Sequence, residues 1–135
     1  MFLPKMRDIS KEELDFSGMK VSKTGNYMIS DADRTIQNAM ANVQSLVTER
    51  SMLISRINSG EETNREDAMT RVQATEDQLN DQLQEAAQSL KGLERSIHLF
   101  EACGDQNTAE RGKAVHRQYA PQLATYFGAS SFEKY

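Results

Sequence analysis

Apolar residues recur every three or four positions along residues 69–100, and this regularity limits what the chain can fold into. Nine of the ten positions in the series are apolar: Met69, Val72, Glu76, Leu79, Leu83, Ala86, Leu90, Leu93, Ile97 and Phe100. An average spacing near 3.5 residues keeps one stripe of a helix facing a neighbour. The segment is therefore predicted to be a helix that buries this stripe against the same chain or another one.

Capping signals place this helix at about residues 62–103. Gly60 ends the preceding element, and Thr63 and Glu66 have the spacing of a capping box, in which each side chain bonds a free backbone N–H group of the first turn. Gly104 suits the left-handed position that follows a helix.

A second helix is predicted over about residues 31–58, with Ser30 as its N-cap. Its apolar stripe is wider, with three positions in each heptad: Ile36, Ala39, Met40, Val43, Leu46, Val47, Leu53, Ile54 and Ile57. A stripe of this width contacts two neighbours, whereas a two-position stripe contacts one. The pattern indicates a helical bundle.

The connection between the two helices is short and centred on Gly60, so they are expected to lie antiparallel as a hairpin. In that hairpin Arg50 and Glu76, the charged residues of the two inner stripes, come close together. They are predicted to form an ion pair that opposes slips in register more than it adds stability. The alternative is that each side chain extends separately to water.

The fold class expected from these features is all-α: an antiparallel helical hairpin or coiled-coil bundle, with an extended N-terminal arm and a short C-terminal helix plus an aromatic tail. The boundaries are predicted at residues 1–29 for a docking arm, 30–104 for the hairpin and 105–135 for the helix and tail. Within the arm, Ser10 to Gly18 has the pattern of a short capped helix, and a small β-hairpin or an extended segment is expected to follow.

The predicted helix at 62–103 is about 60 Å long and its partner about 40 Å, so its apolar end should overhang. Five of the aromatic residues lie in the last 17 positions, and aromatic side chains recur as interface anchors. The residues predicted to bind a protein partner are Leu93, Ile97, Phe100, Tyr119, Tyr126, Phe127, Phe132 and Tyr135. Two alternatives stay open: these residues complete the chain's own core, or the tail has no fixed docking site.

The composition argues against several classes of protein. A net charge of −4 gives no general attraction to the phosphates of nucleic acid. No segment approaches the about 18 apolar residues of a membrane helix, and the first residues lack the core of a secretory signal. A cytoplasmic location, or a particle assembled in the cytoplasm, is expected. Cys103 is the single cysteine, so no intrachain disulfide can form, and a buried, inert thiol is expected.

No residues have the spacing of a catalytic, cofactor or metal site. His98, Cys103 and His116 are separated by four and twelve intervening residues, which match no zinc motif. Gly104 and Gly112 are too far apart for a phosphate-binding loop. The chain is therefore predicted not to be an enzyme and to bind no cofactor.

The function expected from the sequence is that of a structural or assembly subunit, such as part of a phage particle or a secretion machine. Its helical stripes and terminal segments would bind copies of the same chain, as a homo-oligomer, or other subunits. The alternative is an assembly or export chaperone that sequesters an amphipathic helix of a client protein.

Overall fold

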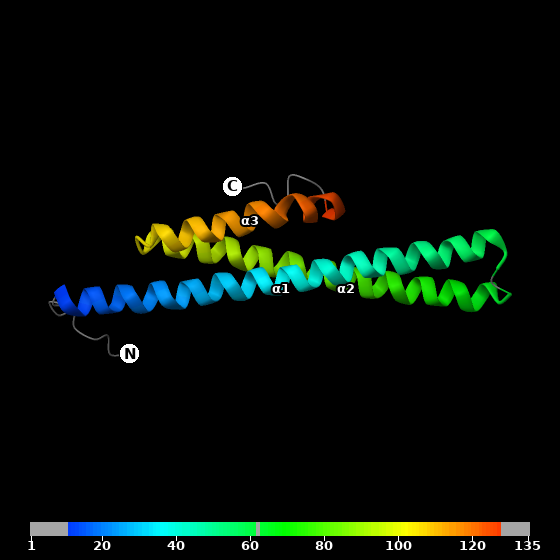
Figure 1. Ribbon diagram of the computed structural model, residues 1–135, viewed down its shortest axis with the longest axis horizontal. Helices are drawn as coiled ribbons and strands as arrows, with labels where there is room; N and C mark the ends of the chain where they lie inside the picture. The colour runs from blue at the N-terminus through cyan, green and yellow to red at the C-terminus, as the bar shows by residue number, and fades with distance from the viewer. Residues whose placement is uncertain (1–10, 62, 128–135) are drawn as a thin grey trace, which may run out of the picture.

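The chain folds into three helices and no strand within the part that the structure describes, residues 11–61 and 63–127. In this computed structural model α1 spans Lys11–Ser59, α2 Arg65–Ala102 and α3 Gln106–Phe127. Side chains are described from residue 24 onward. Helices α1 and α2 lie side by side and antiparallel, and α3 turns back along them (Figure 1). The predicted all-α class and the helical hairpin are confirmed.

Both turns between helices are made by a glycine in the left-handed region, with φ of 80° at Gly60 and at Gly104. In each turn the glycine N–H donates to the carbonyl three residues back, and the next N–H donates to the carbonyl five residues back, at 2.9–3.3 Å. This pattern is the Schellman motif, which satisfies the last carbonyls of a helix. Outside the neighbouring residues of the turn, no atom lies within 4 Å of the place where a Cβ would stand. Glycine is therefore favoured at these two positions by its left-handed backbone conformation and not by lack of space.

Helix α2 begins at Arg65, a few residues later than predicted. The side chain of Asn64 accepts a hydrogen bond from the backbone N–H of Asp67 at 3.0 Å, and Asn64 is therefore the N-cap. The capping box predicted for Thr63 and Glu66 is wrong. Asn and Thr both cap helices well, so the sequence allowed either start.

The predicted start of the first helix is wrong, because α1 runs without a break from Lys11 through Ser30 to the hairpin turn. The short helix ending at Gly18 and the extended or β-hairpin segment after it are wrong for the same reason. Residues 1–10 of the predicted arm lie outside the described residues. Tertiary packing accounts for the continuity: Gly25 is buried inside the helix, where it lets the bundle close tightly.

Close approach between helices explains two of the glycines. A Cβ at Gly25 would lie 2.7 Å from Cγ2 of Thr108, and a Cβ at Gly112 would lie 2.7 Å from Cγ1 of Ile97. Both distances are shorter than van der Waals contact. The two glycines therefore permit the separation at which α3 packs on α1 and α2.

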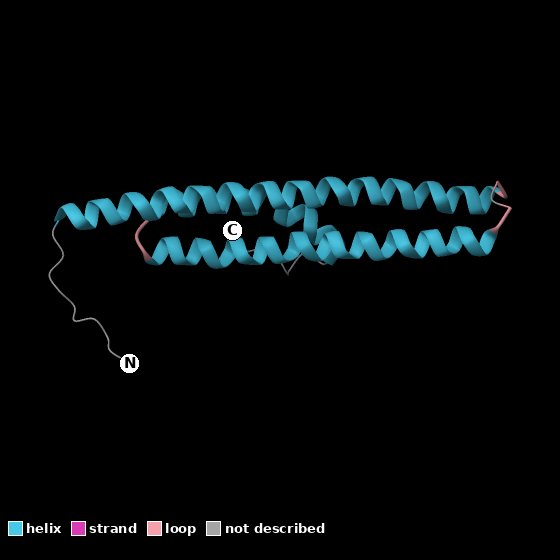
Figure 2. Ribbon diagram, turned by 90° about the horizontal axis from the view of Figure 1, so that it is seen from below, coloured by secondary structure: helices cyan, strands magenta, loops and turns pink. Residues whose placement is uncertain are grey.

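The long α1 removes the overhang predicted for the second helix. At about 1.5 Å per residue, α1 is about 74 Å long and α2 about 57 Å, and α1 extends past the turn that joins α2 to α3 (Figure 2). The apolar end of α2 is covered within the chain, since Leu93, Ile97 and Phe100 are all buried. The predicted overhang is therefore wrong, and for these three residues the alternative in which they complete the chain's own core is the one observed.

The core follows the line where the three helices meet. Its members are mostly at the predicted stripe positions: Ile29, Ile36, Ala39, Met40, Val43, Leu83, Ala86, Ala87, Leu90, Leu93, Ile97, Phe100, Ala109, Tyr119, Ala120 and Leu123. Toward the hairpin turn only two helices remain, and the core narrows.

The predicted 3.5-residue seam does not stay in contact along the whole of α2. Near the hairpin turn Ala68 and Thr75 are buried, whereas Met69, which begins the predicted seam, is exposed. A straight α-helix turns by about 20° per heptad relative to a 3.5-residue repeat, so the contact line moves from one column of residues to the next. The finer prediction of a coiled coil is not supported at this end.

The ion pair predicted between Arg50 and Glu76 is confirmed. Nε of Arg50 lies 2.8 Å from Oε1 of Glu76, and the two side chains are 41% and 37% exposed. A pair this exposed contributes at most about 1 kcal/mol, so its predicted role in setting the register of the hairpin stays a prediction.

Gly25→Ala and Gly112→Ala are each expected to lower the free energy of unfolding by about 1–2 kcal/mol, because overpacking outweighs the gain in helix propensity. Gly92→Ala is the matched control, since the nearest atom to its Cβ would be 3.8 Å away. Urea unfolding of the three variants measures the difference. Equal stability of all three would contradict the role of Gly25 and Gly112 in close packing.

Candidate functional site

Residues seven positions apart give the α1–α2 hairpin two distinct sides. On the first side lie Asn26 and Asp33 of α1 with Glu94 and Glu101 of α2, each of which contacts a residue of α3. This side, called here the α3 face, carries α3. On the second side lie Met28, Thr35 and Asn42 of α1 with Gln82, Ser89 and Ser96 of α2. This side, called here the open face, has no helix of the described chain over it (Figure 1).

In the polar contacts between α3 and the α3 face, the hydrogen-bond donor is on α3. Arg111 donates to Asn26, and the Tyr119 hydroxyl donates to Oδ1 of Asp33 at 2.6 Å. On α2, Nζ of Lys113 lies 3.4 Å from Oε1 of Glu101. The donors lie on α3 and the acceptors on the hairpin, so the two surfaces complement each other in charge.

A histidine and a glutamate are buried together between α2 and α3. Nε2 of His116 lies 2.8 Å from Oε1 of Glu94, and the side chains are only 1% and 8% exposed. Removing one member leaves the other as a buried polar group without this partner, which costs about 1–3 kcal/mol or more. The pair therefore ties α3 to α2 specifically.

This buried pair was not predicted from the sequence. Glu94 lies in the flanking column of α2, and the sequence suggests no role for His116 beyond a metal site whose spacing matches no zinc motif. The sequence does show that Glu94 and Glu101, seven residues apart, share one side of α2, and that His116 and Tyr119, three residues apart, share one side of α3. It does not show that these two sides face each other.

Titration of two side chains is altered where α3 packs. Burial raises the pKa of the Tyr119 hydroxyl to about 12, and its hydrogen bond to Asp33 adds to the shift. A hydrogen bond to Glu110, and a weaker one to Glu101, raise the pKa of Lys113 against the opposing effect of burial. Tyr119 therefore stays a neutral donor and Lys113 a charged one at neutral pH.

Two hollows lie along the open face. The first, of about 340 Å³, is lined by Asn42, Ser45, Leu46, Gln78, Asp81 and Gln82. The second, of about 280 Å³, is lined by Tyr27, Met28, Asp31, Ala32, Thr35, Ser89, Gly92, Leu93 and Ser96. Both use the same columns of α1 and α2, and together they are called here the groove; the hydrogen bond between Asn42 and Gln82 crosses it between the two hollows.

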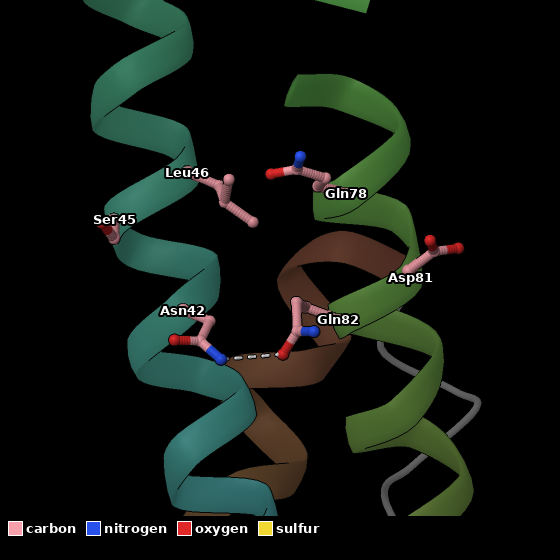
Figure 3. Close-up of a pocket in the computed structure, with 6 residues that line it drawn as sticks. All are labelled: Asn42, Ser45, Leu46, Gln78, Asp81 and Gln82. Carbon is pink, nitrogen blue, oxygen red and sulfur yellow. Dashed lines mark hydrogen bonds between the residues drawn. The ribbon is translucent and has the colours of Figure 1, made fainter. Parts of the chain in front are cut away.

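Figure 3 shows how the first hollow is built. Leu46 from α1 and Gln78 from α2 point toward each other across the groove, whereas Asp81 points away from it. Nδ2 of Asn42 donates to Oε1 of Gln82 at 3.0 Å, which closes one end of the hollow with a polar bridge. Leu46 is the one apolar residue among the six that line this hollow, so an occupant would meet mainly hydrogen-bonding groups around a single apolar contact.

The second hollow has a floor of small side chains. Ala32, Ser89, Gly92 and Ser96 present little bulk, and the exposed Tyr27 stands at the rim. Small residues let a helix backbone come close, as Gly25 and Gly112 do for α3. The two hollows together follow the open face for about 27 Å, from Met28 to Leu46.

The residues predicted to bind a partner are distributed among several environments. Leu93, Ile97, Phe100 and Tyr119 are buried in the chain's own core, with Leu93 also reaching the floor of the second hollow. Phe127 packs partly against the core, and Tyr126 is exposed. Phe132 and Tyr135 lie outside the described residues. The first four residues therefore share one core of the chain itself, whereas they were predicted to bind a partner.

The prediction of a buried thiol is wrong, because Cys103 is exposed. It occupies the C-cap of α2, where the chain turns outward before α3 begins. His98 is also exposed, on the outer surface of α2. The two residues therefore do not meet the buried His116.

Among the residues that the structure describes, no group of three or more His, Cys, Asp or Glu side chains could hold a metal ion. No helix in residues 11–61 and 63–127 is both long and apolar enough to cross a membrane. No protein-family model, curated protein or solved structure matches the chain.

Tyr119→Phe is expected to destabilise the fold by about 1–2 kcal/mol near neutral pH, because Asp33 loses a donor. The pKa of Tyr119 is higher in the folded chain than the value of 10.0 for a free tyrosine. Its contribution is therefore complete below about pH 10 and is lost as the pH rises through about 12.

Thermal melting between neutral pH and about pH 11 measures this contribution. The wild-type melting temperature should fall more steeply with pH than that of Tyr119→Phe. Tyr126→Phe, a change at an exposed tyrosine, should behave like the wild type. Identical pH profiles for Tyr119→Phe and the wild type would contradict the assignment.

Proposed function

We propose that the chain is a non-enzymatic structural or assembly subunit that binds a helix of another protein chain in the groove of its open face. The observation that carries the proposal is the pairing of two hollows in one groove, opposite the side that α3 covers. The described chain supplies a helix for one side of its hairpin only. A partner helix on the other side would complete a four-helix arrangement.

The α3 face supports this proposal by example. It receives a helix by combining a small residue at a point of closest approach, Gly25, with polar side chains such as Asp33 at the edges. The open face has the same combination, with Gly92 and Ser96 in the floor and Asn42 and Gln82 at the edge. A surface built alike favours the same kind of occupant.

A second copy of the chain is the simplest partner for the open face. Two hairpins related by a twofold axis would bury both grooves at once and leave both copies of α3 on the outside. Such a pair would suit a building block of a multi-subunit particle. Further subunits could then bind through Tyr126 and the part of α1 that extends past the turn between α2 and α3.

Assembly chaperone is the second candidate function, and Met28 favours it. Methionine at the rim of a groove adapts to clients of different shape, and Met28 lines the second hollow with an exposed side chain. The two candidate functions predict different behaviour of the protein without a partner. A structural subunit should self-associate, whereas a chaperone should stay monomeric until its client binds.

Ser89→Arg is expected to weaken self-association at least tenfold, because it places a long charged side chain in the floor of the groove. Light scattering over a range of protein concentrations measures the dimer dissociation constant, and circular dichroism confirms that the variant is folded. Gln88→Arg is the matched control, since the neighbouring Gln88 is exposed and lines neither hollow.

Unchanged association of Ser89→Arg would exclude the open face as the contact. A wild-type protein that stays monomeric at high concentration would favour the chaperone over the self-associating subunit. Binding of a client helix that Ser89→Arg abolishes and Gln88→Arg preserves would then support the second candidate.

A further inference from the structure

Large apolar and aromatic side chains lie together at one end of the open face. Tyr27 and Met28 line the second hollow and are 70% and 41% exposed. Leu99, which is 56% exposed, follows Ser96 by three residues and Gly92 by seven, so it lies on the same side of α2 as these two lining residues. Exposed apolar side chains scattered singly need no explanation, whereas several together mark a contact surface.

The register of the hairpin brings these side chains to one level. Asn42 of α1 bonds Gln82 of α2. Counted from this pair along both antiparallel helices, Tyr27 and Leu99 are within about 3 Å of the same level. Tyr27, Met28 and Leu99 therefore form one patch, called here the apolar end of the groove.

Helix α1 continues beyond the apolar end. From Tyr27 to its first residue, Lys11, α1 is about 24 Å long, and the outer part of this segment lies past the end of α2 (Figure 2). In the other direction the groove extends for about 27 Å, from Met28 to Leu46. A helical segment about as long as the groove therefore starts at its apolar end.

We propose that two copies of the chain pair through their apolar ends about a twofold axis near Tyr27, and that the segment of each α1 from Lys11 to Tyr27 lies in the groove of the other copy. The axis places each α1 residue before Tyr27 level with one at the same distance after it. Lys11 of one copy is then level with about residue 43 of the other, so each segment covers most of a groove. The proposal rests on the proposed function, because it names the helix that the open face binds.

The distribution of apolar surface favours a second copy as the occupant and this position for the axis. With the axis near Tyr27, the exposed side chains of Tyr27 and Leu99 from both copies leave water together. An axis at the middle of the groove would instead place each apolar end against the mainly polar first hollow, where polar groups would lose water without gaining partners.

The rest of the fold leaves room for this arrangement. The second hairpin would extend past the end of α2, where only α1 of the first copy continues (Figure 2). Helix α3 is on the opposite side of the hairpin (Figure 1), so it does not obstruct the contact. Tyr126 of α3, and not the segment of α1 beyond α2, is then left exposed for further subunits.

The contact is of sufficient size for a stable dimer. The two α1 helices would lie along each other for about 48 Å, and a helix is about 10 Å wide, so the two copies together would bury roughly 1,000 Å². That is about the smallest area of a specific protein interface. In an interface of this size, the loss of one apolar side chain near the centre should have a measurable effect.

Leu99→Asp is expected to raise the dimer dissociation constant at least tenfold, because it buries two carboxylates beside the twofold axis. Tyr27→Asp should have the same effect. Light scattering over a range of protein concentrations measures the constant, and circular dichroism confirms that the variants are folded. Met52→Asp is the matched control, since Met52 is 52% exposed and lines neither hollow of the groove.

A distance between the two copies locates the axis. In a chain with Cys103→Ser and Met52→Cys, one spin label stands 25 residues after Tyr27. An axis near Tyr27 separates the two labels of a dimer by about 75 Å along the helices, whereas an axis at the middle of the groove separates them by about 45 Å. Double electron–electron resonance measures this distance.

Three results would overturn the proposal. A label distance near 45 Å, or a loss of association in Ser89→Arg without one in Leu99→Asp, would place the axis elsewhere and keep the open face as the binding surface. Equal association of Leu99→Asp and Met52→Asp would exclude the apolar end as the contact. A wild-type chain that stays monomeric would exclude the second copy and leave a client helix as the occupant of the groove.

Discussion

The spacing of seven residues on two antiparallel helices is the constraint on which the rest of this structure depends. It fixes one column of α1 and one of α2 on each side of the hairpin seam. On one side these columns carry hydrogen-bond acceptors such as Asp33 and Glu94, which bind donors of α3. On the other side the columns carry small or uncharged residues such as Ser89 and Asn42, which line the groove. The hairpin register, in which Arg50 pairs with Glu76, therefore aligns both surfaces at once.

The binding of α3 differs from the packing inside the hairpin. Where α1 meets α2, the contacts are mainly aliphatic, as with Ile36 and Leu90. Where α3 meets the hairpin, apolar residues such as Leu123 alternate with polar pairs that need particular partners. Apolar contacts tolerate shifts, whereas a buried polar pair is stable in one arrangement. The polar pairs thus fix where α3 lies along the hairpin.

The sequence was sufficient for the features that depend on local spacing and turn chemistry. The stripe at Leu83 and Leu90, the glycine turns and the Arg50–Glu76 pair could all be predicted, because each follows from neighbours along the chain or from the hairpin register. The start of α1 and the open groove could not. Gly25 resembles a helix breaker until Thr108, which lies 83 residues later, is known to pack against it. The faces of the hairpin are likewise defined only once the position of α3 is known.

The buried Glu94 also decides which side of the hairpin can accept another chain. If α3 left its position, the carboxylate of Glu94 and the oxygens of Asp33 would lose the donors that face them. A competing helix would have to replace both donors at the same spacing as His116 and Tyr119, since a buried acceptor without a donor costs about 1–3 kcal/mol or more. The open face makes no such demand, because the Asn42–Gln82 hydrogen bond across it is exposed and both side chains can bond water instead. A partner helix that enters the groove therefore displaces water from small side chains and breaks no buried pair.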